Sequence, residues 1–404
     1  MEKHKYDMIP NFRKQFNDAF SPEKYQKLKD TCQQHSSTEI GFRLSESPIF
    51  VDKVFQEKLF NAAESIIQQI DSFSAEELNK AIPPESLVPG DDSHYHFLAI
   101  DFGICRNESG ELEPQLIELQ AFPSLFGFQR QYEEDLRSVY PFLDTFKRRI
   151  PINDYIEKLR NIIIGNENPE NVILLEIFPE QQKTAVDFSV TEKFLGIKTI
   201  CLTKIIKEGQ HLFYEDNGRK IKINRIYNRV IFDELDNIPD LKTDFHFTDD
   251  VEVTWITHPN WFFKISKFIL PKLNHTYVPK SYFLNEAPDN LDYSQYVLKP
   301  LFSFAGSGVN IHPKQEDIDR ITDKENYILQ KKVNYAPIFE DINGEFSKAE
   351  IRLLFGKAEG SNKLEFLVNL VRMTKAEMVN VNFNKKDAIW IGSTIAFFEN
   401  DLQK

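Results

Sequence analysis

Acidic residues set into two apolar strands constrain the fold of this chain more than any other feature. The apolar runs 94–101 and 115–119 predict two strands, and the segment Asn107-Glu-Ser-Gly110 between them supplies turn residues. The second run continues directly into Ala-Phe-Pro-Ser rather than into a polar turn. The sequence therefore predicts a β-hairpin, and this continuation argues against a hairpin that lies wholly in solvent.

Three polar side chains of this hairpin form a candidate metal site. Glu118 and Gln120 lie two residues apart, so they point to the same face of their strand, and Asp101 can join them from the neighbouring strand. Carboxylate and amide oxygens are the ligands that Mg²⁺ prefers, and waters and phosphate oxygens complete the octahedron. The alternative is that these side chains form the solvated face of an exposed hairpin.

The rest of the chain mixes helical and strand patterns. Residues 1–80 are predicted to be mainly helical, since apolar positions recur with a helical period over 52–70. The strand–helix–strand order at 172–178, 186–195 and 198–202 predicts a small α/β layer with parallel strands. Further helix is expected over 126–162, and further strands over 225–231, 296–300, 326–330, 349–355 and 365–372. The expected fold class is α/β (α+β), with several subdomains.

A lysine at the end of a strand precedes a glycine loop. Lys299 lies in the run Tyr-Val-Leu-Lys-Pro, and Ser303, Gly306 and Gly308 follow before a second strand is expected to resume at Val309. Small residues let backbone N–H groups approach phosphate oxygens, and a lysine on a strand supplies a fixed positive charge. A hairpin with a flexible tip and a surface lysine explains the pattern equally well.

The next predicted strand changes abruptly from apolar to polar. It ends at Gln330 and is followed by Lys332, and a strand end beside an apolar slot can hydrogen-bond the edge of an adenine ring. The commoner explanation is a strand that leaves the core. Only its position after the glycine loop favours a nucleotide.

Two arginines lie inside apolar strands near the C-terminus. Arg352 and Arg372 each need an anionic partner, because an unpaired buried charge is costly. Glu350 or another carboxylate can be that partner, and so can a phosphate or a substrate carboxylate.

Charge and cysteine content exclude several classes of partner. The chain carries 49 basic and 62 acidic residues, a net charge of −13, which repels nucleic acid and anionic lipid. Its 3 cysteines are scattered and favour a reducing compartment over a disulfide framework. No apolar leader or membrane-length run is present in the sequence, so a cytoplasmic location is expected.

Together these segments resemble the circularly permuted ATP-grasp family, specifically the glutathionylspermidine synthase-like synthetases. The hairpin is similar to the metal-binding segment of that family, with Asp101, Glu118 and Gln120 at the ligand positions. The segment 261–271 is similar to the Asn-Lys helix of the family, which makes Lys267 a lysine that contacts nucleotide phosphate. The resemblance also implies a second nucleotide lysine, an adenine hinge and a late arginine that assists phosphate transfer, which are Lys299, Gln330 and Arg372.

The sequence departs from the family pattern at two positions. The family carries an arginine two residues before the metal-binding aspartate, where this chain has Ala99. Gln120 stands where asparagine is usual and keeps the amide oxygen on a longer side chain. We expect Arg352, rather than Arg106 or Arg130, to take over the role of the missing arginine.

The resemblance implies an ATP-dependent carboxylate–amine ligase that forms an amide through an acyl phosphate. ATP and Mg²⁺ would be the cofactors, Arg352 and Arg372 the catalytic residues, and a small-molecule or peptide carboxylate and an amine acceptor the substrates. The implied fold is a circularly permuted ATP-grasp fold with an additional small α/β layer and a helical N-terminal region. The expected divisions are 1–150 for the helical region and the hairpin, 151–258 for the α/β domain, 259–335 for the lid with the glycine loop, and 336–404 for the core strands.

Three other functions compete with the ligase. A catalytically inactive ATP-grasp protein would bind nucleotide without ligation, in keeping with Ala99. A zinc enzyme could use His94 and His96, which share a strand face, although such a pair without further ligands is usually structural. A scaffold without nucleotide would leave the lysine–glycine loop unexplained. A homodimer is the default expectation for the oligomeric state.

Overall fold

A six-stranded antiparallel sheet forms the centre of the computed structural model, which describes residues 7–91, 94–238, 240–303, 307–377 and 388–402. The strands run in the order β17-β16-β15-β2-β3, and β14 pairs with β15. Their bounds are β2 Phe97–Arg106, β3 Leu112–Gln120, β14 Phe339–Glu340, β15 Phe346–Gly356, β16 Glu365–Thr374 and β17 Gly392–Thr394. The predicted hairpin is therefore confirmed as β2 and β3, and the C-terminal strands pair beside it.

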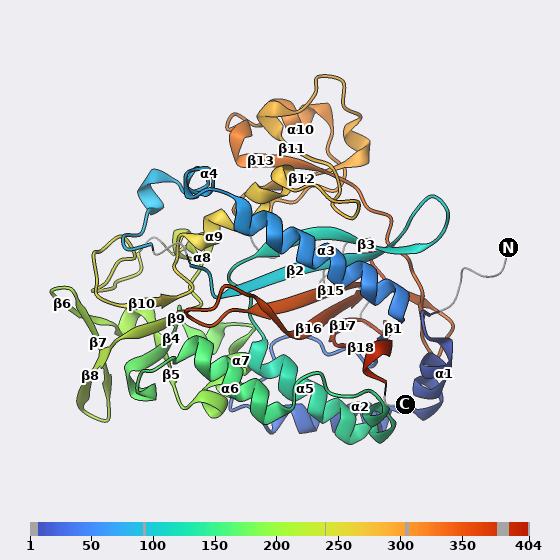
Figure 1. Ribbon diagram of the computed structural model, residues 1–404, viewed down its shortest axis with the longest axis horizontal. Helices are drawn as coiled ribbons and strands as arrows, with labels where there is room; N and C mark the ends of the chain where they lie inside the picture. The colour runs from blue at the N-terminus through green and yellow to red at the C-terminus, as the bar shows by residue number, and fades with distance from the viewer. Residues whose placement is uncertain (1–6, 92–93, 239, 304–306, 378–387, 403–404) are drawn as a thin grey trace.

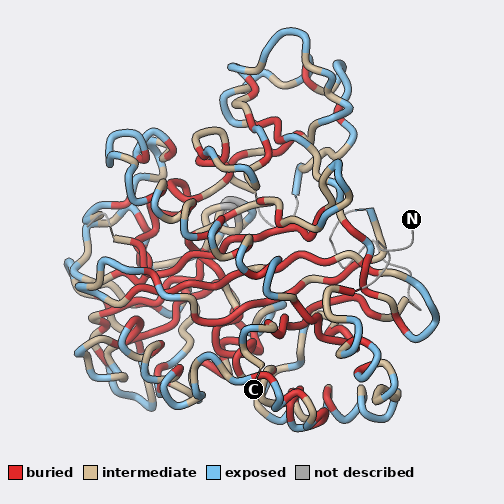
Figure 2. Tube along the Cα trace, turned by 45° about the vertical axis from the view of Figure 1, so that its right-hand side comes forward, coloured by how far each residue is buried: buried red, intermediate tan, exposed pale blue. Residues whose placement is uncertain are grey.

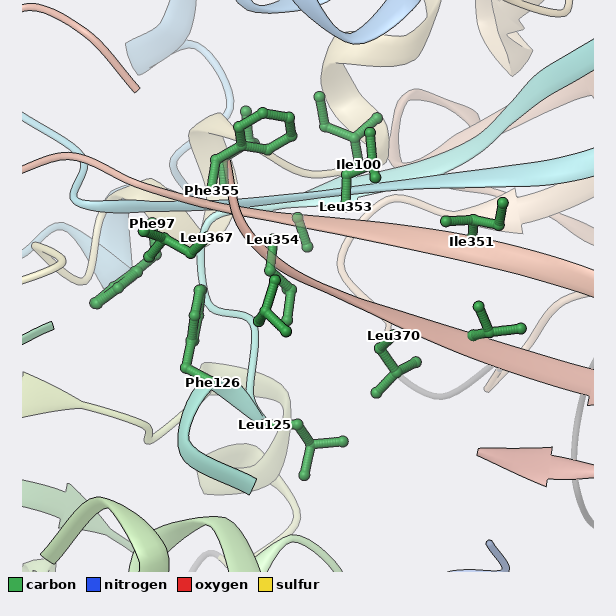
Figure 3. Close-up of a cluster of buried hydrophobic side chains, with 14 of the residues drawn as sticks. Phe97, Ile100, Leu125, Phe126, Ile351, Leu353, Leu354, Phe355, Leu367 and Leu370 are labelled. Atoms are coloured by element: carbon green, nitrogen blue, oxygen red, sulfur yellow. The ribbon is translucent and has the colours of Figure 1, made fainter. Parts of the chain in front are cut away.

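Runs of consecutive buried side chains show that both faces of the central strands are covered. Ile100 of β2 lies opposite Leu353 of β15, and both are fully buried (Figure 3). Phe97 packs against Phe126 with ring centroids 4.6 Å apart. Burial of such side chains removes apolar surface from water and holds the sheet against its covering helices. The central strands are accordingly buried along most of their length (Figure 2).

Helices cover the central sheet (Figure 1). Helix α3 lies along β3, whereas α5 packs on β16 and on α2 and α7. The helices of this group are α1 Pro10–Ala19, α2 Pro22–Gln33, α3 Lys53–Ser72, α4 Ala75–Asn79, α5 Phe126–Val139, α6 Ile152–Ile163 and α7 Ala185–Leu195. The helical structure expected over 126–162 is confirmed as two helices, α5 and α6, which Pro141 and Pro151 separate. The short strands β1 Ile49–Val51 and β18 Ala396–Phe398 pair in parallel.

The predicted α/β layer is a four-stranded parallel sheet in the order β10-β9-β4-β5. Its bounds are β4 Val172–Glu176, β5 Lys198–Cys201, β9 Arg225–Asn228 and β10 Thr254–Ile256. Helix α7 connects β4 to β5, which confirms the strand–helix–strand prediction. An antiparallel sheet that the sequence analysis did not anticipate follows β5, with strands β6 Ile206–Glu208, β7 His211–Asp216 and β8 Arg219–Ile223.

A small three-stranded sheet with its own core lies over the β3 edge of the central sheet (Figure 1). Its strands, in the order β11-β13-β12, are β11 Ser281–Phe283, β12 Tyr296–Pro300 and β13 Tyr327–Lys331, and helix α10 Gln315–Arg320 packs on them. Leu284, Leu298, Ile318 and Leu329 form its core. The strand expected to resume at Val309 is wrong: Asn310 makes a single antiparallel bridge to Leu298 instead. We call this unit, residues 281–331, the lid sheet.

Three further short helices lie between β9 and the lid sheet in the sequence. They are α8 Phe232–Asp236, α9 Trp261–Lys264 and the 3-10 helix η6 Lys267–Lys272. In the part of the chain that the structure describes, no helix combines the length and apolar character needed to cross a membrane.

Candidate functional site

Asp101 and Arg352 form the centre of a charged cluster in the central sheet. They lie directly opposite each other in the β2–β15 pairing. Arg352 donates from Nε to Oδ1 of Asp101 at 2.6 Å and from Nη2 to Oδ2 at 2.7 Å. The side chain of Asp101 is 1% exposed and that of Arg352 is 12% exposed. This bidentate geometry is among the strongest ion-pair arrangements in proteins.

Arg372 adds a second guanidinium from the next strand. Its Nη2 atom also donates to Asp101 and lies 3.0 Å from Oε2 of Glu350, its cross-strand neighbour. Burial alone would lower the pKa of Arg372, but the carboxylates of Asp101, Glu350 and Glu118 outweigh it and raise that pKa. Burial raises the pKa of Glu350, against the lowering effect of Arg372, and the hydroxyl of Tyr335 donates a hydrogen bond to the Glu350 carboxyl.

A β-bulge in β3 places Glu118 at this cluster. Asp101 pairs with Glu118 while the next residue, Phe102, pairs with Leu116, so Ile117 is the extra residue. The lid sheet bonds this edge strand, since Lys299 Nζ donates to the Ile117 carbonyl at 3.1 Å. The side chain of the lid residue Gln330 donates to the Leu116 carbonyl at 3.1 Å and accepts from Lys299. These bonds satisfy backbone groups that an edge strand would otherwise leave unpaired.

Four cationic side chains lower the pKa of Glu118, whose side chain is 31% exposed. Burial alone would raise its pKa, but Arg372, Lys267, Arg352 and Lys299 lower it to about 2. Burial, together with the nearby ammonium of Lys267, lowers the pKa of Lys299 to about 8 despite the opposing carboxylates. Lys267 itself donates to the backbone carbonyl of Ser303. We define the charged cluster as Asp101, Glu118, Lys267, Lys299, Glu350, Arg352 and Arg372.

The predicted magnesium ligands meet, but they face arginines. With its amide oxygen turned toward Arg352, Gln120 accepts from Nη2 at 3.0 Å and from Nη1 at 3.1 Å. Both oxygens of Asp101 accept from guanidinium groups, and Oε1 of Glu118 lies 3.4 Å from Arg352. Among the described residues, no group of three or more His, Cys, Asp or Glu side chains is placed to hold a metal ion. As arranged, these oxygens do not fit Mg²⁺, because they already accept hydrogen bonds from guanidinium groups.

Three of the remaining predicted nucleotide residues, Ser303, Gly308 and Lys332, lie in the described part of the chain. Ser303 lies at the cluster through Lys267, whereas Gly306 falls outside the described residues. Gly308 has a φ of +67°, and a Cβ there would lie 2.8 Å from Cγ of Pro300, so the turn requires glycine. Lys332 follows β13, where its backbone amide donates to the Gln295 carbonyl.

Gln330, the predicted adenine hinge, contacts other parts of the protein with both its backbone and its side chain. Its backbone pairs with both neighbouring strands of the lid sheet, and its side-chain amide bonds Lys299 and Leu116. Gln330 therefore joins the lid sheet to β3 in this structure, and its role toward a base remains a prediction.

The alternative residues weighed from the sequence lie elsewhere. Arg106 donates to the Gly110 carbonyl in the hairpin turn, and Arg130 is buried against glutamates of α5. Arg352 is therefore the one of the three that contacts Asp101.

The rings of His94 and His96 lie 4.6 Å apart, and burial lowers the pKa of His96 to about 3.

Two residues of the site were not assigned to it from sequence. Glu350 appeared only as a structural partner for arginine, and Tyr335 carried no signal at all. Glu350 was detectable in principle, because it lies two residues before Arg352 and therefore on the same strand face. Its partner proves to be Arg372.

Comparison with solved structures relates this fold to that of a glutathione synthetase-like effector from Globodera pallida in its apo form. The TM-score is 0.61 at 10% sequence identity, and the match covers 94% of this chain and 99% of that chain. No protein-family model and no curated protein matches the sequence. The chain thus has a glutathione synthetase-like fold of mixed α/β class. The circular permutation and the glutathionylspermidine synthase-like grouping remain predictions.

Proposed function

We propose that the charged cluster binds the phosphates of ATP and that the protein is an ATP-dependent carboxylate–amine ligase. The observation that carries this proposal is the set of cations around one carboxylate, Glu118. Arg352 and Arg372 lie 3.4 and 3.8 Å from its Oε1, and Lys299 donates to the carbonyl of the preceding residue, Ile117. Lys267, together with these three, lowers the pKa of Glu118. These cations come from four separate segments of the chain. Two of them lie on η6 and the lid sheet, and two lie on the central sheet, so an anion at this position would contact both units.

The reaction would proceed in two steps. The terminal phosphoryl group of ATP would pass to a substrate carboxylate, which yields ADP and an acyl phosphate. An amine would then attack the acyl carbon, form the amide and release inorganic phosphate. Small-molecule or peptide carboxylates and an amine acceptor are the substrate classes this chemistry requires.

The roles of the cluster follow from charge and position. Lys267 and Lys299 would neutralise phosphate oxygens, and Arg372, whose side chain is 31% exposed, would stabilise charge on the transferring group. Asp101 and Glu350 would orient Arg372, because both are buried and bonded to it. Fixed charges of this kind accelerate transfer mainly by positioning and by electrostatic stabilisation.

Nucleotide binding without ligation is the second candidate function. It is favoured by the engagement of Asp101 and Gln120 with Arg352, which leaves the predicted ligands without an open cation position. This function predicts ATP binding with no ADP release when carboxylates and amines are supplied together.

Thermal unfolding in the presence of ATP tests the nucleotide site. Ligand that binds only the folded state stabilises it by about 2.7 kcal/mol at a hundredfold excess over Kd. We expect ATP to raise the melting temperature of the wild-type protein and of Lys331→Met, whose lysine is exposed at the end of β13. Lys299→Met should abolish the rise. An equal rise in Lys299→Met would overturn the assignment of the site, and assays of ADP release would then separate the two candidate functions.

A further inference from the structure

The cation that contacts the acidic hairpin residues is a guanidinium group of the protein itself. Arg352 contacts Asp101, Glu118 and Gln120, which are the three side chains predicted to hold Mg²⁺. It approaches them from the adjacent strand β15, and its pairing with Asp101 follows from the register of two long strands. A sheet register is fixed by many residues at once, so the position of Arg352 is a property of the fold.

We propose that Arg352 takes the place of the divalent cation, so that this cluster binds a nucleoside polyphosphate without a metal ion. This inference rests on the nucleotide-binding half of the proposed function. The ligand class is a polyphosphate anion that carries its full charge, unlike the metal complex in which such nucleotides usually bind to proteins.

The energetics of the ion pair favour the arginine over a metal. A divalent ion that took the oxygens of Asp101 would deprive the guanidinium of Arg352, which is 12% exposed, of its bidentate partner. Removal of one partner from a buried ion pair is strongly destabilising, because it leaves an uncompensated buried charge. Arg372 would lose a bond to the same carboxylate, which adds to the cost.

Charge balance leads to the same conclusion. The charged cluster contains four cationic side chains and three carboxyl groups, so its carboxylates are already neutralised by the protein. At many phosphate-binding sites a bound metal ion neutralises the carboxylates instead. Here the excess of positive charge is present before any ligand binds, and a polyphosphate is the ligand that complements it.

Calorimetric titration with ATP, once in EDTA and once in excess MgCl₂, tests the proposal. We expect wild-type protein to bind in both buffers with dissociation constants that differ by less than about tenfold. Binding that appears only with MgCl₂ would overturn the inference while leaving the nucleotide site intact. Absence of binding in both buffers would overturn the proposed function, and the inference with it.

Arg352→Met tests the converse case, in which a metal ion can occupy the position that the guanidinium group leaves. Methionine keeps much of the length of the side chain and removes its charge, so Asp101, Glu118 and Gln120 become available to a metal. We expect this variant to bind ATP weakly in EDTA and to recover affinity with MgCl₂. Arg219→Met, which removes an exposed arginine from β8, should behave as wild type. Equal, metal-independent binding by Arg352→Met would overturn the role of Arg352.

Arg352→Lys covers the case in which the methionine variant fails to fold. Lysine keeps the charge but cannot form the bidentate pair. We expect it to retain binding in EDTA with reduced affinity, because one positive charge remains at the position. A lysine variant that binds ATP only with MgCl₂ would contradict the proposal. A titration with MgCl₂ alone provides a second measurement: wild-type protein should show no Mg²⁺ binding, and detectable binding would count against the inference.

Discussion

Lys299 Nζ lies 3.1 Å from the carbonyl oxygen of Ile117, the extra residue of the bulge in β3. A residue of the lid sheet thus bonds the backbone of the central sheet at the point where Glu118 enters the charged cluster. The pKa of Lys299, lowered to about 8 chiefly by its burial, makes the charge of this contact dependent on pH.

Nucleotide affinity should therefore fall as pH rises through about 8. Below this value Lys299 is protonated and attracts phosphate, and above it the neutral amine loses that attraction. The phosphates themselves remain ionised across this range, since their second pKa is about 6. Dissociation constants for ATP measured from about pH 7 to about pH 9.5 will check this. In Lys299→Arg the fall should be absent, and a fall of the same size in that variant would assign it to another group.

Glu176 should make the protein less stable as pH rises through the neutral range. Burial raises its pKa to about 8, from an ordinary value of 4.5, against the lowering effect of Arg229. Between these values the folded protein holds a proton that the unfolded chain has released, so stability declines as pH increases. The decline should be on the order of a few kcal/mol.

Glu176→Gln isolates this effect, because the amide oxygen can still accept the bond from the Ile177 amide. We expect its melting temperature to exceed that of wild type by several degrees near pH 8 and to match it near pH 4.5. The exposed Glu180→Gln is the control. Equal melting temperatures for Glu176→Gln and wild type at both pH values would contradict the prediction.

Asp187 of α7 stabilises the start of α5. Its Oδ2 accepts from the Leu125 amide at 2.8 Å and its Oδ1 from the Phe128 amide at 2.9 Å. Asp187→Ala leaves two buried N–H groups without this acceptor, which should cost about 2 to 4 kcal/mol. Urea unfolding followed by tryptophan fluorescence will measure the loss. Asp187→Asn keeps one oxygen acceptor and should lose less, so a loss as large as that of alanine would point to charge rather than to hydrogen bonding.

Gly308→Ala should loosen the lid sheet. The added Cβ would lie 2.8 Å from Cγ of Pro300 at a backbone φ of +67°. Gly360→Ala shares the positive φ, at +75°, but meets nothing within 4 Å, so it isolates the cost of the contact. We expect Gly308→Ala to increase hydrogen exchange at the amides of β12 and β13, and Gly360→Ala to leave them unchanged. Unchanged exchange in both variants would show that the contact with Pro300 is relieved without cost.

Local patterns predicted much of the fold from the sequence. The hairpin, the strand of Lys299 and the strand–helix–strand of the α/β layer each depend on periodicity and turn residues within a short stretch. The break between α5 and α6 was not predicted, although Pro141 and Pro151 mark it in the sequence.

The contacts of the candidate site were less accessible, because they depend on register between distant strands. Arg352 and Asp101 are 251 residues apart in sequence, and nothing local indicates that they pair. The bulge at Ile117 likewise changes which residues face each other without any glycine or proline to mark it. The charged side chains are therefore predictable from the sequence, but whether the arginines bind carboxylates or a ligand is not. In the structure they bind carboxylates.

The pairing of β2 with β15 has a consequence for folding during synthesis, because the ribosome produces the two strands at very different times. Asp101 leaves the exit tunnel long before Arg352 and Arg372 are synthesised. The sequence separation between β1 and its partner β18, at 396–398, is larger still. During synthesis the hairpin therefore lacks the strand that completes its hydrogen bonding, and domains usually fold as units while translation proceeds. Until the C-terminal strands are synthesised, the nascent hairpin exposes its apolar side chains and the Asp101 carboxylate to solvent, and transiently exposed apolar surface of this kind is prone to aggregation.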